Sequence, residues 1–190
     1  MILYPTETIY GLGVNALDDS ELERLFWLKG RDERQTVSWG VRDLADIEYY
    51  AEASDVAAEI IRAFLPGPLT LVLPAKSTVP ASRQAPDRTV GFRIPGDVLA
   101  RKIIADFIDT HGAPLTCTSA NMSGLPPQPT VPEILEQFGE RASEIETIID
   151  DGTRSDVPST VVRVVGDEIT VHREGAISEA DIRAAVRAVR

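Results

Sequence analysis

"SDVAAEIIRAFLPGPLTLVLP", residues 54–74, contains the signals of a helix, of its end and of a strand. Apolar residues recur with a helical period over 54–65, and the Pro-Gly-Pro sequence that follows cannot continue a helix. The next six residues, 69–74, are an apolar run of strand length. A helix that leads directly into a buried strand is typical of the α/β class.

The same alternation extends in both directions from this stretch. We expect strands at 1–4, 36–41, 69–74, 89–95, 113–119, 146–150, 160–165 and 168–173, and helices at 20–30, 54–65, 97–111, 132–139 and 178–190. A capping box from Ser20 to Glu23 is expected to start the first helix, and Gly112 to end the third. The Gly-Asp turn inside residues 160–173 predicts an antiparallel hairpin, and alternating helices and strands predict parallel pairs. The fold class is therefore α/β with a mixed sheet.

Composition limits the kinds of protein that this chain can be. Its 190 residues, 43% of them hydrophobic and without internal repeats, are expected to form one domain, 1–190. No apolar run approaches the roughly 20 residues of a membrane span, and no signal peptide is evident, so we expect a cytoplasmic protein without membrane partners. Cys117 is the only cysteine, and together with His111 and His172 it offers no spacing for a structural metal site.

The chain is strongly acidic. The formal net charge is -11, and 16 arginines stand against three lysines. Such a surface repels phosphate backbones, so we expect weak or no direct nucleic-acid binding. An acidic, lysine-poor surface fits a halophilic archaeon, where salt screens the repulsion, as well as it fits an ordinary soluble acidic protein.

Polar clusters stand at the ends of the predicted strands or in the following loops, which is where open α/β sheets bind ligands. They are "PTET" at 5–8, "KGR" at 29–31, "TVGFR" at 89–93, "TSANMSG" at 118–124, "PST" at 158–160 and "HREG" at 172–175. Each also has a structural interpretation as a turn or a helix cap. "GLGVNA" at 11–16 is only a weak match to a dinucleotide fingerprint, because Ala16 stands in place of the third glycine.

Two chemical features favour a binding site for anions. Arg93 interrupts an apolar strand, and a buried guanidinium requires a carboxylate from the protein or from a ligand. No serine or cysteine nucleophile has a histidine at hand, so covalent catalysis has no evident candidate. Cations and hydroxyls dominate the clusters, which suits the neutralisation of phosphates and carboxylates.

The order of the motifs carries a resemblance to a known family. "YPTETIYGLGVNA", "LKGR", "PGPLTLVL", "TVGFRIP", "TSANMSG", "PSTVV" and "HREG" follow one another between residues 4 and 177 as in the YrdC/TsaC family of threonylcarbamoyl-AMP synthases. The resemblance implies an open twisted mixed sheet with flanking helices and a deep central cavity, in a single YrdC-like domain. It implies that L-threonine, bicarbonate or CO2, and ATP with Mg²⁺ react to give threonylcarbamoyl-AMP and pyrophosphate, for a downstream transferase complex that modifies adenosine 37 of tRNA.

The resemblance also assigns residues to roles. It implies the catalytic signature Lys29, Arg31, Ser119 and Asn121, with ATP held by Lys29, Arg31, Gln35, Thr89, Ser119, Asn121 and Arg173. Threonine would be held by Thr8, Arg93, the backbone of Cys117, and Ser159. Lys29 and Arg31 are expected on the solvent side as phosphate ligands. Gly40 stands where many relatives carry histidine, so we expect water or another side chain in that space.

The residues themselves are consistent with this reaction. Attack of a carbamate oxygen on the α-phosphorus needs cations to bring two anions together and to neutralise the leaving pyrophosphate, which Lys29, Arg31 and Arg173 can supply. No carboxylate cluster predicts a metal cage, so Mg²⁺ is expected to arrive on ATP. Arg93 suits a two-pronged bond to the threonine carboxylate. Two alternatives are an RNA-binding module of the same fold and a carbamoyl-AMP-forming domain like that of hydrogenase-maturation carbamoyltransferases.

Overall fold

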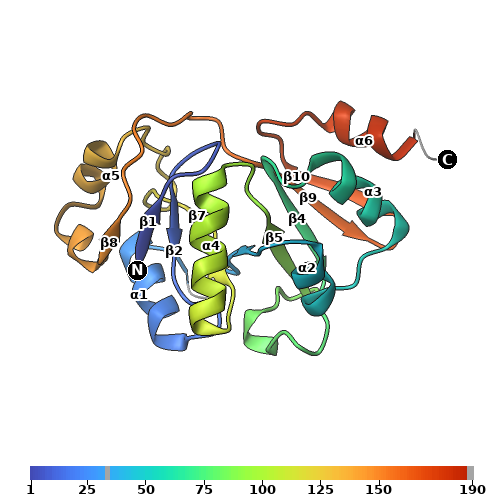
Figure 1. Cartoon of the computed structure of the whole chain (residues 1–190), viewed down its shortest axis with the longest axis horizontal. Coiled ribbons are helices and arrows are strands. Elements are labelled where there is room, and N and C mark those ends of the chain that lie inside the picture. Colours follow the sequence, from blue (N-terminus) through green and yellow to red (C-terminus); the bar gives the residue numbers. More distant parts are fainter. Residues whose placement is uncertain (33–34, 188–190) are drawn as a thin grey trace.

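The protein is described by a computed structural model that covers residues 1–32 and 35–187 (Figure 1). Its strands form two sheets, one of four strands in the order β7-β2-β1-β8 and one of six in the order β10-β9-β4-β5-β3-β6. The four-stranded sheet contains β1 (Ile2–Tyr4), β2 (Gly11–Gly13), β7 (Thr118–Ser119) and β8 (Thr147–Ile148). The six-stranded sheet contains β3 (Trp39–Gly40), β4 (Leu69–Pro74), β5 (Thr89–Arg93), β6 (Leu115–Thr116), β9 (Thr160–Val165) and β10 (Glu168–Arg173). The α/β class with mixed strand pairing is confirmed, in two sheets rather than one.

Each sheet has its own helices, and one helix stands between the sheets. They are α1 (Asp19–Lys29), α2 (Leu44–Tyr50), α3 (Asp55–Phe64), α4 (Val98–His111), α5 (Val131–Phe138) and α6 (Glu179–Arg187), with short 3-10 segments η1 (Ala81–Arg83) and η2 (Gly139–Glu144). In Figure 1, α1 and α5 lie with the small sheet, α3 and α6 with the large sheet, and α4 stands between the two. No helix within the described ranges is long and apolar enough to cross a membrane.

The large sheet holds the larger core. β4 pairs in parallel with β9 and antiparallel with β5, and β9 forms the expected antiparallel hairpin with β10. Apolar side chains of α3 pack against the sheet; Ile60, Leu71, Phe92 and Val162 are fully buried in one cluster. Burying such a side chain stabilises the fold by about 1.5–3 kcal/mol each, which explains why the apolar stretch 54–74 forms the centre of the fold.

The predicted strand 113–119 is divided between the two sheets. Its first part, β6, pairs with β3 of the large sheet, and its last part, β7, pairs with β2 of the small sheet. Cys117 lies at the crossing, where its backbone N–H donates to the carbonyl of Ser38 at 2.7 Å. The chain therefore joins the sheets at the point where they diverge.

Some local predictions differ from the structure. Helix α1 begins earlier than expected, because Asp18 rather than Ser20 is its N-cap and accepts from the N–H of Glu21. Helix α2 was not expected; it has seven residues with Ile47 as its buried residue, too little for a clear apolar period. Strand β2 was not expected either. It runs through the sequence Gly-Leu-Gly, where a side chain at Gly13 would lie 2.7 Å from Leu115 of β6, so the close approach of the sheets requires glycine.

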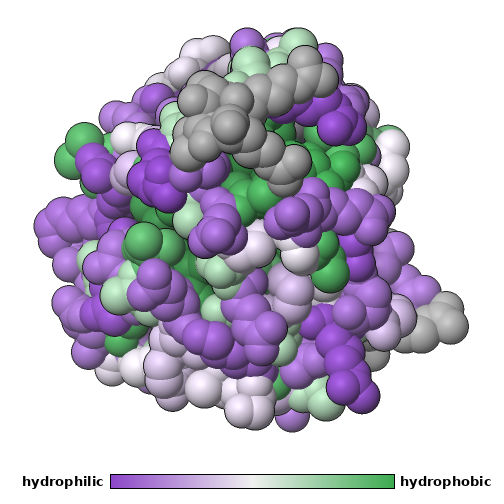
Figure 2. Space-filling view, turned by 90° about the vertical axis from the view of Figure 1, so that its right-hand side faces the viewer, coloured by the Kyte–Doolittle hydropathy of each residue, from purple (hydrophilic) through white to green (hydrophobic). Residues whose placement is uncertain are grey.

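The surface agrees with the acidic composition. Hydrophilic residues cover most of the face shown in Figure 2, and hydrophobic residues show mainly in the hollows between them. The net charge of -11 is therefore carried on a well-solvated exterior.

Candidate active site

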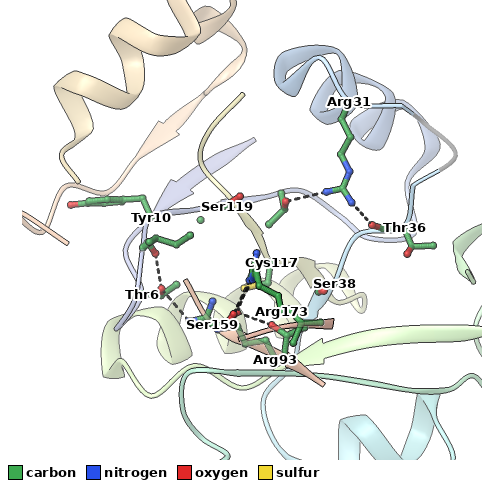
Figure 3. A pocket seen from close by; sticks show the side chains of 15 residues that line it. Thr6, Tyr10, Arg31, Thr36, Ser38, Arg93, Cys117, Ser119, Ser159 and Arg173 are labelled. Atoms are coloured by element: carbon green, nitrogen blue, oxygen red, sulfur yellow. Dashed lines mark hydrogen bonds between the residues drawn. The ribbon is translucent and has the colours of Figure 1, made fainter. Parts of the chain in front are cut away.

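A cavity of about 190 Å³ lies between the two sheets (Figure 3). Its wall is built by the loop between β1 and β2, the segment between α1 and β3, the crossing at Cys117, and the adjacent ends of β4, β5, β9 and β10. Hydroxyl groups line much of it: Thr6, Thr36, Ser38, Thr70, Ser119 and Ser159. The volume is below the roughly 300–1,000 Å³ of sites that enclose drug-sized ligands, so it can enclose a ligand of the size of an amino acid, and a larger ligand would extend beyond it.

Arg93 ends strand β5 and is only 5% exposed. One nitrogen, Nη2, donates to Thr8 Oγ1 at 2.6 Å, to Glu7 Oε1 at 2.9 Å and to Thr6 Oγ1 at 3.3 Å. The expected carboxylate partner is thus found within the protein, as Glu7, while Nε is buried without a partner. Burial by itself would lower the pKa of Arg93, but Cys117 and Glu7 beside it raise that pKa above its usual value.

Two further guanidinium groups face the same cavity. Arg31 donates to the carbonyl of Thr36 at 2.7 Å and to Gln35 Oε1 at 3.0 Å, and Arg173 donates to the carbonyl of Ser159 at 2.8 Å. Burial lowers the pKa of both, and Arg93 lowers that of Arg173 further. Within residues 1–32 and 35–187, neither has a carboxylate within 4 Å. Figure 3 shows Arg93 and Arg173 near Ser159, with Arg31 across the cavity from them.

Lys29 does not lie where we expected it. The side chain is 3% exposed and does not line the cavity; its Nζ donates to the carbonyls of Ser119 and of Asn121, the latter at 2.8 Å. Burial, with a smaller contribution from Arg31, lowers the pKa of Lys29 to about 7. The predicted solvent-side position of Lys29 is therefore wrong, because the last turn of α1 packs against the loop after β7. Its role as a phosphate ligand stays a prediction.

Ser119 and Asn121 differ in their position relative to the cavity. Ser119 lines the cavity. Asn121 shapes the loop, since its Nδ2 donates to the carbonyls of Met122 at 2.9 Å and Leu125 at 2.6 Å, while its Oδ1 is buried without a partner. The backbone N–H of Ser123 donates to the carbonyl of Lys29 at 2.8 Å, so the helix end and the loop are bonded in both directions.

Two residues expected at the nucleotide are not brought to the cavity. Thr89 begins strand β5, four residues before Arg93, and donates to Asp87 at 2.7 Å. A strand rises about 3.3 Å per residue, which separates Thr89 from Arg93 by about 13 Å. Gln35 is exposed and reaches the site only through its bond to Arg31; it lines a smaller cavity of about 100 Å³ beside it.

The residues expected at threonine lie together. Ser159 and Cys117 line the cavity, although the Cys117 N–H is already engaged by Ser38. Thr8 is buried behind Arg93, and Thr6 rather than Thr8 reaches the cavity wall.

The space opposite Gly40 is filled by another side chain. A Cβ on Gly40 would lie 2.8 Å from Ile104 Cδ1, so Ile104 of α4 occupies that space. The expectation that a side chain or water takes the place of the family histidine stays a prediction.

Several residues in or beside the cavity were missed. Thr6 and Glu7 belong to the motif "PTET" that we singled out, so the signal was present. Tyr10, whose hydroxyl donates to the carbonyl of Gly152 at 2.6 Å, follows that motif. Ser38 and Thr70 give no signal, because only the order of the strands brings them to the cavity.

Known proteins match this chain over most of its length. A family model for the Sua5, YciO and YrdC proteins, described as telomere recombination, matches residues 1–175. A Methanocaldococcus jannaschii protein provisionally named threonylcarbamoyl-AMP synthase is 36% identical over 93% of this chain and 80% of its own length. Threonylcarbamoyl-AMP synthase of Pyrococcus abyssi is 34% identical over 100% of this chain but only 54% of its own length, so the chain spans about half of that relative.

The fold is shared as well. The crystal structure of P. abyssi Sua5 complexed with L-threonine superposes with a TM-score of 0.84 and 33% identity, over 97% of this chain and 53% of that one. Escherichia coli YciO superposes with a TM-score of 0.82 and 25% identity, over 95% of this chain and 85% of that one. The chain thus shares its fold with a relative whose crystal structure is a complex with L-threonine.

Proposed function

Since the chain belongs to the Sua5/YciO/YrdC family, we propose that it is a threonylcarbamoyl-AMP synthase and hence a nucleotidyltransferase. It would condense L-threonine, bicarbonate or CO2, and ATP into threonylcarbamoyl-AMP and pyrophosphate. This chain spans about half of the length of some of the relatives that carry this name.

One observation carries the proposal: three guanidinium groups converge on a small cavity lined with hydroxyls. Arg31, Arg93 and Arg173 line it, and among the described residues Glu7 is the one carboxylate paired with any of them. Three cations around one cavity repel each other unless anions enter. An amino-acid carboxylate and a chain of phosphates would supply those anions.

The deep part of the cavity suits threonine. Arg93 lines the cavity and donates to Thr6, Glu7 and Thr8 through Nη2, so the rest of its guanidinium can donate to a carboxylate in the cavity. Thr6, Thr70 and Ser159 line the cavity nearby and can bond a ligand hydroxyl or amine. A ligand without the hydroxyl would leave such groups unpaired, so we expect threonine to bind better than valine, with serine as the nearest competitor.

The chemical step requires positive charge near the phosphates, which the other two arginines would supply. The threonine amine adds to CO2, or to bicarbonate with loss of water, and the carbamate oxygen then attacks the α-phosphorus of ATP while the bond to pyrophosphate breaks. Arg31 and Arg173 would neutralise the charge on the phosphates, and the hydroxyl of Ser119 would donate to a phosphate oxygen. Positioning and electrostatic stabilisation suffice for such a transfer, without a protein nucleophile.

Magnesium would enter as part of the nucleotide. Among the described residues, no group of three or more His, Cys, Asp and Glu side chains could hold a metal ion. Mg²⁺ on the ATP phosphates would keep several of its waters and help to neutralise the leaving pyrophosphate.

The product would be used by a separate transferase complex that modifies adenosine 37 of tRNA, in the cytoplasm. The net charge of -11 argues against tight direct binding of tRNA by this chain. A filter-binding titration with tRNA in rising salt distinguishes this from an RNA-binding module, which would bind at physiological salt.

The test of the activity is pyrophosphate release with ATP, Mg²⁺, bicarbonate and each amino acid in turn. We expect release to depend on L-threonine and on bicarbonate, and threonylcarbamoyl-AMP to be found by mass spectrometry. Release that does not depend on an amino acid would contradict the proposal.

A further inference from the structure

Resting on the proposed function, we propose that Glu7 is a positioning residue that orients Arg93 for recognition of the carboxylate of the amino-acid substrate. Glu7 belongs to the motif "PTET", yet neither the reaction nor the lining of the cavity uses it. Its carboxylate bonds to Arg93 of β5 and to the backbone at the amino end of α4.

Both oxygens of the Glu7 carboxylate have partners. Oε1 accepts from Arg93 Nη2 at 2.9 Å, and Oε2 faces the backbone N–H of Asp97 at 3.4 Å. Asp97 is the N-cap of α4, and the amino end of a helix attracts negative charge. The carboxylate therefore bridges the end of β5 and the amino end of α4.

This arrangement determines which donors of Arg93 remain for a ligand. All three protein acceptors, Thr6, Glu7 and Thr8, bond to Nη2. The side chain is 5% exposed and lines the cavity, while its Nε is buried and has no partner among the described residues. A guanidinium that donates to the protein through one terminal nitrogen keeps other donors for an anion in the cavity. Glu7 and the two threonines thus hold one end of the guanidinium so that the rest faces the ligand.

The charge of Glu7 is suited to this role. Burial by itself would raise the pKa of Glu7, but Arg93 and backbone N–H groups outweigh burial and leave that pKa below its usual value. Glu7 is therefore ionised at neutral pH and compensates the charge of Arg93 before a substrate enters. Two opposite charges fixed in this way give an oriented site that does not need to reorganise when a carboxylate binds.

The test compares Glu7→Gln, which keeps the shape and removes the charge, with Glu7→Asp, which keeps the charge. Glu144→Gln is the matched control, because it removes the charge of a carboxylate that forms an ion pair with Arg24 at 2.7 Å, outside the cavity. Binding of L-threonine, of L-threoninamide, which lacks the carboxylate, and of ATP is measured by calorimetry, together with KM and kcat for pyrophosphate release.

We expect Glu7→Gln to weaken L-threonine binding about tenfold, as for the loss of one charge-assisted contact, and to raise KM for threonine with little change in kcat. ATP and threoninamide binding should not change, Glu7→Asp should recover part of the loss, and Glu144→Gln should resemble wild type. Unchanged threonine affinity in Glu7→Gln would overturn the proposal. Equal weakening of threonine, threoninamide and ATP would overturn it too, since that result indicates a general structural role.

The outcome also separates this inference from the proposed function. If wild type binds another amino acid instead of threonine, the proposed activity fails, but a tenfold weaker affinity of Glu7→Gln for that amino acid still supports the positioning role. If wild type binds no amino acid, both are refuted.

Discussion

Lys29 offers the sharpest test of the structure, because it is a charged group in an environment that disfavours charge. The substitution Lys29→Met removes the ammonium group and keeps an unbranched side chain of similar length. In wild type the ammonium donates to the carbonyls of Ser119 and Asn121, and burial followed by Arg31 lowers its pKa from 10.5 to about 7. The lysine of the unfolded chain titrates near 10.4.

The sign of the pH dependence follows from these two values. Between about pH 7 and pH 10 the unfolded chain holds a proton on Lys29 that the folded protein has released, so the free energy of unfolding rises with pH. One proton contributes at most about 1.4 kcal/mol per pH unit. The free energy of unfolding of wild type, relative to Lys29→Met, should therefore increase by about 2–3 kcal/mol from pH 7 to pH 9.

The assay is urea unfolding of both proteins at several pH values from 6 to 9. Taking the difference between wild type and variant removes the titration of all other groups that the two share. Lys102→Met serves as control, because Lys102 is an exposed lysine of α4, and its difference from wild type should stay constant. A constant difference for Lys29→Met as well would refute the reasoning, since it would mean that Lys29 is solvated in the folded protein.

Three more substitutions test the site. Arg31→Ala should lower pyrophosphate release at least a hundredfold without changing the urea midpoint, and wild-type turnover would contradict its assignment to the phosphates. Ser119→Ala should weaken ATP binding about tenfold in calorimetry, because a donor to a charged oxygen is lost; an unchanged Kd would exclude that contact. Arg93→Ala should raise the Kd for L-threonine at least tenfold, since it removes the charged partner of the carboxylate, and a retained affinity would show that the carboxylate binds elsewhere.

Local physics allowed much of the fold to be predicted. The helix over 54–65, the strand at 69–74, the helix over 97–111 and the hairpin over 160–173 all agree with the structure to within a residue or two. Each has its signal within a few neighbouring residues, as an apolar period, a proline stop or a glycine turn. The segments predicted less well are short: α2 buries little, and β2 is three residues long.

The candidate site was predicted in composition but only partly in geometry. Arginines and hydroxyls at strand ends indicated an anion site, and Arg31, Arg93, Arg173, Ser119 and Ser159 do meet at one cavity. Arg93 was expected to require a carboxylate from the protein or from a ligand, and the structure supplies one from Glu7.

The sequence by itself determined the class of the fold and the chemical character of the site, because both depend on residue types and on local spacing. Tertiary structure alone decided which of these residues act together. Lys29 and Arg31 are two residues apart, yet one is buried against a loop ninety residues further along the chain and the other faces the cavity. Thr89 and Arg93 share a strand, but only the strand end reaches the site. Whether a residue reaches the site depends on which distant segments of the chain pair, and the local sequence pattern does not determine that pairing.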